Sequence, residues 1–510
     1  MNFKFNNLYD ISVYQAKKKK RKTALFADEK RVTYAEILQK VDKLAEYLLA
    51  KGIKEGDKVA LFLRNSPEFI YAIFAISKIG AISVPINTFL KEKEVDYILE
   101  DSGAKLLLAS EIYENVIKKI TVCQNIIWEG VNEPSSLYRF EDAYVLDVKS
   151  EHKKRAHDDC AVIIYTSGTT GNPKGAMLSN KNLLSNMEYA SLLMEVTAKD
   201  TVMVFLPMFH SFTLTAGVLM SLYCGGSIVI IKSIQPFANI IKQTLTKRVT
   251  LFFGIPDVYN SLAKAKLPWY FLWFNKIRAF VSGAAALQPK TIEAMAKKFK
   301  RAKLLEGYGL SEASPVVCVN TIKKQKVGSV GCVMYGNELK IVNEELEEVE
   351  TKVVGDIIYK GDNVMLGYLN RPEATKETII NGWLQTGDMG YVDEEGFLFI
   401  VDRKKDLIIS KGINIYPRGI EEVIDAFPGV LASAVIGIFD ERSGEVPIAY
   451  IELEEGVSTL DTKGLRQHMR KNLANFKIPK QLNIIEKLPK NATGKVLKRA
   501  LKEKLRNEEK

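Results

Sequence analysis

The most informative stretch of the sequence lies at residues 165–175 and reads Tyr165-Thr166-Ser167-Gly168-Thr169-Thr170-Gly171-Asn172-Pro173-Lys174-Gly175. It directly follows the apolar run at residues 161–164, which predicts a buried strand. Glycines let backbone N–H groups turn toward an anion without steric cost, hydroxyl side chains add hydrogen-bond donors, and the lysine adds a mobile positive charge. The stretch therefore predicts a strand that leads into a phosphate-binding loop.

Spacing excludes two familiar phosphate-binding loops. Gly168 is followed five positions later by Pro173 and Gly171 by Ala176, so the Gly-Lys-Ser/Thr ending of a P-loop is missing. No G-x-G-x-x-G follows a strand, which excludes the dinucleotide fingerprint. The stretch resembles the signature loop of the adenylate-forming superfamily, which includes acyl-CoA synthetases, luciferases and the adenylation domains of peptide synthetases. Taken alone, an ordinary glycine-rich connection is the alternative.

Length and composition predict a globular protein with several packed units. The chain has 510 residues, more than the roughly 250 to 300 that a single core organises. Hydrophobic residues make up 47% and charged residues 26%, which excludes a disordered chain. The five cysteines show no C-x-x-C pairing, which is typical of buried thiols in a reducing compartment. Neither a secretory signal nor an apolar run of 18 residues is seen, so a cytoplasmic location is expected.

The charge balance favours anionic ligands. Lys and Arg number 72 and Asp and Glu 61, so the net charge is +11. No nucleic-acid-binding motif accompanies the basic tracts, and we expect no nucleic-acid partner. The basic run at residues 17–22 is interpreted as a solvated face or helix end. An alternative for this run is loose peripheral contact with the anionic inner membrane surface.

The order of apolar runs predicts an α/β protein. A capping box at Thr33 and Glu36 starts a helix, and strands then alternate with helices through residues 58–63, 67–79, 81–85, 105–108, 126–128 and 161–164. This alternation of strands and helices predicts parallel sheets covered by helices on both faces. With the resemblance, it implies a large N-terminal domain of parallel αβαβα-type sheets plus a β-barrel-like subdomain at residues 1–402. A hinge would join it to a small α+β C-terminal domain at residues 403–510.

A second motif follows a predicted strand at residues 202–206. His210 stands between Phe209 and Phe212, and alone it fits a packed core histidine as well as a catalyst. In the superfamily, an aromatic residue and histidine at this motif border the carboxylate and the acyl pocket. The resemblance implies that Phe209, His210, Phe212, Gly217 and Gly283 bind the acyl group. The apolar segment at residues 212–223 predicts a buried helix. The resemblance implies that this helix lines an acyl tunnel, where each buried methylene would add to binding.

Peptide-synthetase domains place an aspartate near this motif to hold the amino group of their substrate. Here His210 and Ser211 stand in that region, which disfavours α-amino acid substrates.

Three further motifs resemble the superfamily's nucleotide site. Small residues at 282–286 follow a strand and either form a shelf for adenine at Ala284 or a tight strand-to-helix turn. The run at residues 305–312 carries two carboxylates, and a carboxylate suits Mg²⁺. Thr386-Gly387-Asp388 predicts a short turn with one exposed carboxylate, suited to a ribose. The resemblance assigns ATP and AMP binding to Thr166, Ser167, Gly168, Thr169, Thr170, Gly171, Lys174, Ala284, Glu306, Gly307, Tyr308, Gly309, Ser311, Asp388, Arg403 and Lys495.

The resemblance also assigns the metal, the hinge and the second half-reaction. Glu312 and Thr166 would hold Mg²⁺, and Lys405 would be the pivot of the hinge. Lys411 and Gly412 would approach CoA. Lys495, in the run Pro489-Lys490-Asn491-Ala492-Thr493-Gly494-Lys495, would reach the carboxylate and the α-phosphate, whereas Lys498 and Arg499 read as a basic tail.

Together these motifs predict an ATP-dependent long-chain fatty acid–CoA ligase that uses Mg²⁺, with Lys495, Glu312, His210 and Lys411 as catalytic residues. An acyl-AMP ligase that loads acyl carrier protein and an aryl-acid CoA ligase are the alternatives among enzymes. A non-catalytic nucleotide-binding relative is the alternative of a different class, and Glu312, Asp388 and Lys495 argue against it.

Overall fold

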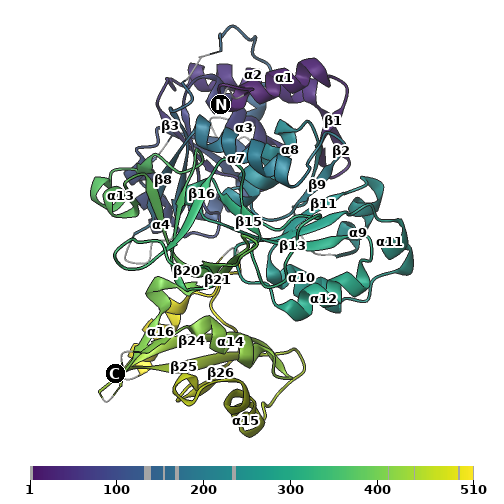
Figure 1. Ribbon diagram of the computed structural model, residues 1–510. Coiled ribbons are helices and arrows are strands. Elements are labelled where there is room, and N and C mark those ends of the chain that lie inside the picture. Colours follow the sequence, from purple (N-terminus) through teal and green to yellow (C-terminus); the bar gives the residue numbers. More distant parts are fainter. Residues whose placement is uncertain are drawn as a thin grey trace.

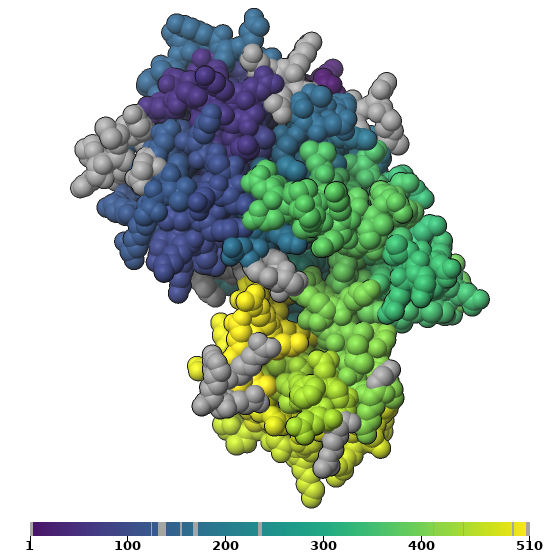
Figure 2. Space-filling view, turned by 90° about the vertical axis from the view of Figure 1, so that its left-hand side faces the viewer, coloured from purple at the N-terminus to yellow at the C-terminus, as the bar shows by residue number. Residues whose placement is uncertain are grey.

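The computed structural model describes residues 4–123, 125–130, 139–152, 156–166, 172–232, 237–411, 413–441, 443–491 and 494–508. The chain forms a large N-terminal part and a small C-terminal lobe beneath it (Figure 1). The space-filling view shows the same lobe from the side, in yellow and yellow-green (Figure 2).

The first sheet has the strand order β18-β8-β7-β4-β3-β5-β6. The strands from β7 to β6 run parallel, whereas β8 and β18 are antiparallel to their neighbours. Their bounds are β3 Lys58–Phe62, β4 Ile82–Pro85, β5 Leu106–Ser110, β6 Ile126–Glu129, β7 Cys160–Thr166, β8 Lys174–Ser179 and β18 Gly367–Tyr368.

The second sheet has the order β15-β14-β13-β12-β11-β9-β10-β1-β2. It is parallel from β13 to β1 and antiparallel at both ends. Its bounds are β1 Thr23–Ala27, β2 Lys30–Thr33, β9 Thr201–Val204, β10 Ser227–Ile230, β11 Leu251–Gly254, β12 Ala279–Ser282, β13 Lys303–Gly309, β14 Val316–Val319 and β15 Cys332–Val333.

Helices form three layers around these two sheets. One layer lies between the sheets, and the others cover the outer faces, which gives the expected αβαβα arrangement. Between the sheets lie α1 Leu8–Lys18, α2 Tyr34–Ala50, α3 Pro67–Lys78, α7 Asn180–Leu193, η2 Phe212–Leu219 and α8 Met220–Tyr223. The outer and shorter helices are α4 Glu92–Ser102, η1 Glu111–Tyr113, α5 Glu114–Ile117, α6 Phe140–Ala143, α9 Phe237–Thr246, α10 Pro256–Lys264, α11 Trp269–Phe274, α12 Pro289–Lys298, η3 Ser311–Ala313 and α13 Pro372–Thr378.

Strand β3 shows why the sequence folds this way. Val59 and Leu61 face the inner helical layer, whereas Ala60 and Phe62 face the outer one. Because successive side chains in a strand point to opposite faces, a strand buried on both faces must be apolar throughout. The expected helix after residue 33 is also confirmed, since the Thr33 side chain accepts from Glu36 N and Glu36 completes the capping box.

An antiparallel sheet, β16-β17-β20-β19 with β21 beside β20, packs with the β13–β15 edge around one buried core. This corresponds to the expected barrel-like subdomain. Its bounds are β16 Glu338–Val342, β17 Gly355–Lys360, β19 Ile379–Ile380, β20 Trp383–Val392 and β21 Leu398–Arg403.

The small lobe is a mixed sheet, β23-β22-β25-β24 with β26 beside β25, flanked by helices. It begins after the short helix η4 Lys404–Asp406, so the predicted boundary between residues 402 and 403 falls within the end of β21 and stays a proposal. Its elements are β22 Ile408–Ser410, β23 Ile413–Ile415, α14 Pro417–Asp425, β24 Val430–Asp440, β25 Gly444–Leu453, α15 Thr462–Asn472, η5 Asn475–Lys477, β26 Leu482–Ile485 and α16 Lys498–Glu508.

Among the described residues, none of the helices combines the length and the apolar character that a bilayer crossing requires.

Candidate active site

The carboxylate of Asp388 lies at the centre of a polar cluster. The Tyr308 hydroxyl donates to Asp388 Oδ2 at 2.6 Å, and Arg403 Nε lies 3.2 Å from Oδ1. Burial and the nearby carboxylate raise the pKa of Tyr308 well above its ordinary value, so it remains a donor. Two residues from distant positions therefore hold this carboxylate, whose remaining lone pairs can accept from vicinal hydroxyls.

The predicted Thr386-Gly387-Asp388 turn is wrong. These residues lie inside strand β20, where residues 386–388 oppose a single residue of β17 and the pairing register shifts. Gly387 has a φ of +73° and Thr386 Oγ1 donates to Ile357 O at 2.7 Å. The segment is a bulge, and such bulges redirect a side chain at the edge of a site. The bulge directs Asp388 into the cluster, where its carboxylate is buried and not exposed as the sequence analysis expected.

Lys495 comes to this cluster from the small lobe. The Lys495 N–H donates to Asn491 Oδ1 at 2.9 Å, and Gly494 has a φ of +78°. Burial lowers the pKa of Lys495 to about 7, helped by the positive charge of Arg403 and opposed by Asp388. The ammonium group therefore shares the electrostatic environment of the Asp388 cluster.

Glu312 and Lys174 meet at a tyrosine that the sequence analysis missed. The Tyr368 hydroxyl donates to Glu312 Oε1 at 2.9 Å, and Lys174 Nζ lies 5.1 Å from the centre of the Tyr368 ring. Tyr368 is held there because β18 pairs with β8. Thr166 is also near, since it faces Lys174 across the β7–β8 pair and its hydroxyl is 3.5 Å from Lys174 O.

The predicted acyl-binding segment touches the same region. Ser211 Oγ lies 3.0 Å from Ser311 Oγ, so the start of the apolar segment lies beside the nucleotide motif. Phe212 packs over Gly283, where an added Cβ would lie 3.2 Å from the ring, and forms an edge-to-face pair with Phe253. Phe209 packs at 6.3 Å from an exposed phenylalanine of the loop before α4.

His210 is held as a neutral imidazole. Its Nδ1 accepts from the Phe212 N–H at 3.3 Å, and burial lowers its pKa to about 4. At neutral pH it can therefore donate from Nε2 but carries no charge.

The predicted adenine-binding residues lie where β12 and β13 end. Ala284 has a φ of +70°, a conformation that non-glycine residues rarely adopt and that is found at functional sites. Glu306 is 3% exposed, and its Oε1 accepts from the Leu287 N–H at 3.1 Å. Burial raises the pKa of Glu306 to about 7. Glu306 thus fixes the turn after Ala284.

Glycines allow the backbones to approach closely in this motif. A Cβ at Gly309 would lie 2.1 Å from Pro315 O, and one at Gly307 would lie 3.3 Å from Cys318 O. Only glycine fits at residue 309 without movement of the neighbouring backbone.

The segment at residues 212–223 is buried and helical, as expected, but its first part is a π-helix. The wider turn places Met220 N on Thr215 O, a pattern that often occurs at functional sites. Gly217 lies in this turn, where an added Cβ would meet Val204 and Thr213 at 3.6 Å.

Of the remaining predicted residues, Lys411 lies away from this cluster in the described contacts, whereas Lys405 is close enough for the charges of Arg403 and Asp388 to act on it. Lys411 has a φ of +50° at the tip of the β22–β23 hairpin, is exposed, and donates from its backbone N–H to Ser443 O at 2.7 Å. Lys405 lies in η4, between the large part and the small lobe. The structure thus brings Lys495, but not Lys411, to the Asp388 cluster. The predictions for Ser167, Gly168, Thr169, Thr170, Gly171 and Gly412 fall outside the described residues.

A Mg²⁺ ion would find few protein ligands here. In the described part of the chain no group of three or more His, Cys, Asp and Glu side chains is placed to hold a metal ion. The Glu312 carboxylate lies beside strands β7 and β8, which carry Thr166 and Lys174. Mg²⁺ is commonly bound by one or two protein oxygens together with phosphate and water. The residues fit a metal that arrives with a polyphosphate.

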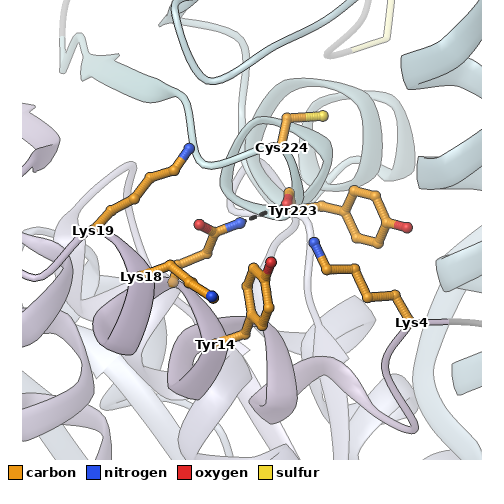
Figure 3. Close-up of a pocket in the computed structure, with 7 residues that line it drawn as sticks. Lys4, Tyr14, Lys18, Lys19, Tyr223 and Cys224 are labelled. Atoms are coloured by element: carbon orange, nitrogen blue, oxygen red, sulfur yellow. Dashed lines mark hydrogen bonds between the residues drawn. The ribbon is translucent and has the colours of Figure 1, made fainter.

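A separate pocket of about 450 Å³ lies between α1 and the end of α8 (Figure 3). Lys4, Lys18 and Lys19 line it together with Tyr14 and Tyr223. None of the predicted site residues lines it. The basic run lies at the end of α1, where Lys17, Lys18 and Lys20 are exposed, in agreement with the predicted solvated helix end.

Comparisons with known proteins agree with this geometry. The family of AMP-binding enzymes matches residues 13–369, and its C-terminal domain matches residues 419–495. A long-chain-fatty-acid–CoA ligase of Bacillus subtilis is 34% identical, over 94% of this chain and 91% of the relative. A feruloyl-CoA synthase of Amycolatopsis sp. is 34% identical, over 92% of each chain. The crystal structure of ATP-bound MatB from Rhodopseudomonas palustris superposes with a TM-score of 0.91 at 31% identity, covering 99% of this chain and 100% of the other.

The α/β fold, the lysine of the small lobe and the Tyr308–Asp388 pair define an adenylate-forming enzyme. By the extent of both matches, the chain belongs to the family of AMP-binding enzymes.

Proposed function

We propose that this protein is a fatty acid–CoA ligase, which forms an acyl-adenylate from ATP and then transfers the acyl group to the thiol of CoA. Adenylate-forming CoA ligase activity is the broader part of this proposal and is supported by the family and by relatives along the full chain. The choice of a fatty acid, the need for Mg²⁺ and the residue roles below are our inferences.

The observation that carries the fatty-acid proposal is an uncharged apolar segment that starts at the nucleotide site. Residues 211–223 contain no charged side chain, and Ser211 touches Ser311. His210 is neutral, so it offers no cation to a second carboxylate on the substrate. Each methylene buried along such a segment contributes about 0.8 kcal/mol. An unbranched aliphatic tail is the substrate that this lining supports best.

The site residues have separate roles in the first step, the formation of the acyl-adenylate. Asp388, fixed by Tyr308 and Arg403, accepts from the ribose hydroxyls. The Lys495 ammonium stabilises negative charge as a carboxylate oxygen attacks the α-phosphorus of ATP and the bond to pyrophosphate breaks. When Mg²⁺ is bound at Glu312, it supplies further neutralisation of phosphate charge.

The second step needs a different arrangement of the small lobe. The thiol sulfur of CoA attacks the acyl carbon of the mixed anhydride, its proton is lost, and AMP leaves with the bonding electrons. Lys411 lies at an exposed hairpin tip in the present arrangement. We propose that rotation about Lys405 withdraws Lys495 and brings Lys411 and Gly412 toward CoA.

An aryl acid is the second candidate substrate. The edge-to-face pair of Phe212 and Phe253 lies at a ring-centre distance of 5.8 Å and would also suit a flat ring. The feruloyl-CoA synthase relative has the same identity as the fatty-acid relative.

A hydroxamate-trapping screen of acids from acetate to oleate, together with benzoate-type acids, tests the proposal. We expect the rate to rise with alkyl length, and a preference for benzoate-type acids would refute the fatty-acid assignment. Gly217→Phe should block long acids but not acetate, because the added ring projects toward Val204, and Gly217→Ala is the matched control with ordinary contacts at 3.6 Å. Thioester formation with acyl carrier protein and not with CoA would show that the carrier protein, and not CoA, is the acyl acceptor.

A further inference from the structure

Helix α11, residues Trp269–Phe274, exposes an unusual amount of aromatic surface. The exposed fractions are 73% for Trp269, 43% for Tyr270, 70% for Trp273 and 60% for Phe274. With about 200 Å² per aromatic side chain, these four residues leave on the order of 500 Å² of ring surface in solvent. Single exposed hydrophobic residues are normal, but a contiguous patch of this size usually has a function.

The helix is firmly held, so its exposure is not a sign of poor packing. Phe271 is buried and packs edge-to-face with Phe299 at 6.2 Å. Asn275 Nδ2 donates to Phe271 O at 2.9 Å, and Arg301 donates to the carbonyl oxygens of Leu272, Trp273 and Asn275. One face of the helix is therefore fixed in the core while the other is presented outward.

Positive charge surrounds this patch. Residues 264–278 and 297–303 contain nine lysines and arginines and no aspartate or glutamate. Contacts of Arg301 and Phe299 place the second segment beside the helix. The exposed lysines of these two segments are Lys264, Lys266, Lys276, Lys297, Lys300 and Lys303.

We propose that α11 is a membrane-interface anchor, with its aromatic side chains inserted among the headgroups of an anionic bilayer and the lysines bound to lipid phosphates. Tryptophan and tyrosine with flanking lysines are the residues that partition to lipid interfaces. Protein–protein interfaces also use aromatic residues but are depleted in lysine, which makes a protein partner a poorer fit. Anionic lipid supplies the complementary charge.

The position of the helix suits this role. α11 lies at the outer edge of the large part, beside α9 and α12, and projects away from its centre (Figure 1). It lies apart from α1, which carries the basic run considered for membrane contact from the sequence. The six-residue helix is long enough to lie in the interface and too short to cross a bilayer.

Vesicle binding by the full chain tests the proposal. We expect flotation with phosphatidylcholine vesicles that contain phosphatidylglycerol and weaker binding to phosphatidylcholine alone. Trp269→Ser with Trp273→Ser should lower partitioning about tenfold or more, because the inserted rings supply the apolar contact. The matched control is Phe439→Ser, which removes a ring that is 80% exposed in the small lobe. Each variant should keep ATP–pyrophosphate exchange and its unfolding temperature.

Tryptophan fluorescence tests insertion directly. The chain has four tryptophans, and replacing Trp128 and Trp383 by Phe leaves only the two on α11. Their emission should shift to the blue on anionic vesicles and be quenched by brominated lipid. Lys266→Glu with Lys276→Glu should weaken binding about tenfold, and added salt should do the same.

Three results would overturn the proposal. They are no binding to any vesicle, binding without quenching by brominated lipid, and concentration-dependent self-association that the α11 substitutions abolish. The last would show that a second copy of the chain covers the patch. Vesicle binding lost on neutralising residues 17–22 but retained in the α11 variants would move the contact to α1.

Discussion

The lowered pKa of Lys495 leads to a pH dependence that is specific to the first half-reaction. If its ammonium must neutralise phosphate charge, the active form of the free enzyme is lost as the pH rises above about 7. Activity should fall and not rise with increasing pH, because a lysine with a lowered pKa loses its positive charge at a lower pH than an ordinary lysine does. At pH 7 about half of the molecules carry the charge, and at pH 9 about one in a hundred does.

We therefore expect kcat/KM for ATP in ATP–pyrophosphate exchange to fall about fifty-fold between pH 7 and pH 9. The perturbation is Lys495→Arg, because a guanidinium stays protonated across this range. The Arg variant should retain part of the activity and lose the alkaline limb. Lys495→Ala should abolish exchange while sparing thiolysis of supplied acyl-adenylate.

The reasoning would be refuted by an alkaline limb that persists in Lys495→Arg, since another group would then be responsible. Equal loss of both half-reactions in Lys495→Ala would also contradict it, because the lysine would then act in both steps or in folding. Far-UV circular dichroism and the unfolding temperature of each variant serve as controls.

Three other changes test separate parts of the site. Tyr308→Phe keeps the ring but removes the 2.6 Å hydrogen bond to Asp388. Because a hydrogen bond to a charged group contributes about 1.5–3 kcal/mol, KM for ATP should rise about tenfold or more in exchange assays. Burial raises the pKa of Glu306 to about 7, so the unfolded chain releases this proton at lower pH than the native enzyme does. The native enzyme should therefore lose about 3 kcal/mol of stability between pH 4.5 and pH 7. Glu306→Gln should remove this loss, which denaturant titration at several pH values measures. Lys411→Ala changes an exposed side chain and should slow thiolysis by CoA while leaving exchange and stability unaltered, whereas slowed exchange would contradict its assignment.

Local signals in the sequence were sufficient for much of the fold. The capping box at Thr33, the apolar strands and the alternation with helices each depend on residues within a few positions, and the structure contains them all. The motif at residues 305–312 could also be assigned to the nucleotide site from the sequence, because glycines and a tyrosine in that order restrict what the backbone and the ring can contact. Tyr308 and Asp388 then meet as two separately predicted residues.

Features that depend on distant pairing were missed. Tyr368 reaches Glu312 from 56 positions away through the two-residue strand β18, whose length gives no pattern in the sequence. Lys498 was interpreted as part of a basic tail, but that is wrong: its Nζ lies 2.8 Å from Glu421, and both side chains are largely shielded from solvent. Composition alone cannot separate a solvated lysine from one that is paired across the lobe.

Several polar contacts join the large part and the small lobe. Lys264 Nζ lies 2.6 Å from Glu454, and Lys490 Nζ lies 2.9 Å from Asp257. Asp425 accepts two further hydrogen bonds from the large part, one from Gln288 and one from Lys290. Exposed ion pairs contribute only about 0–1 kcal/mol each, so these contacts hold the lobe weakly.

Weak docking fits the proposed use of Lys495 and Lys411 in turn. In the present arrangement Lys495 shares the environment of Asp388, whereas Lys411 lies at an exposed hairpin tip. A lobe fixed by a large apolar interface would favour adenylation and trap the acyl-adenylate, because the second lysine could not approach. A lobe held by a few screened ion pairs can leave after pyrophosphate does, and the buried cation of Lys495 then returns to solvent, where its charged form is more stable. Recovery of charge by Lys495 would thus favour the rotation that we propose for the second half-reaction.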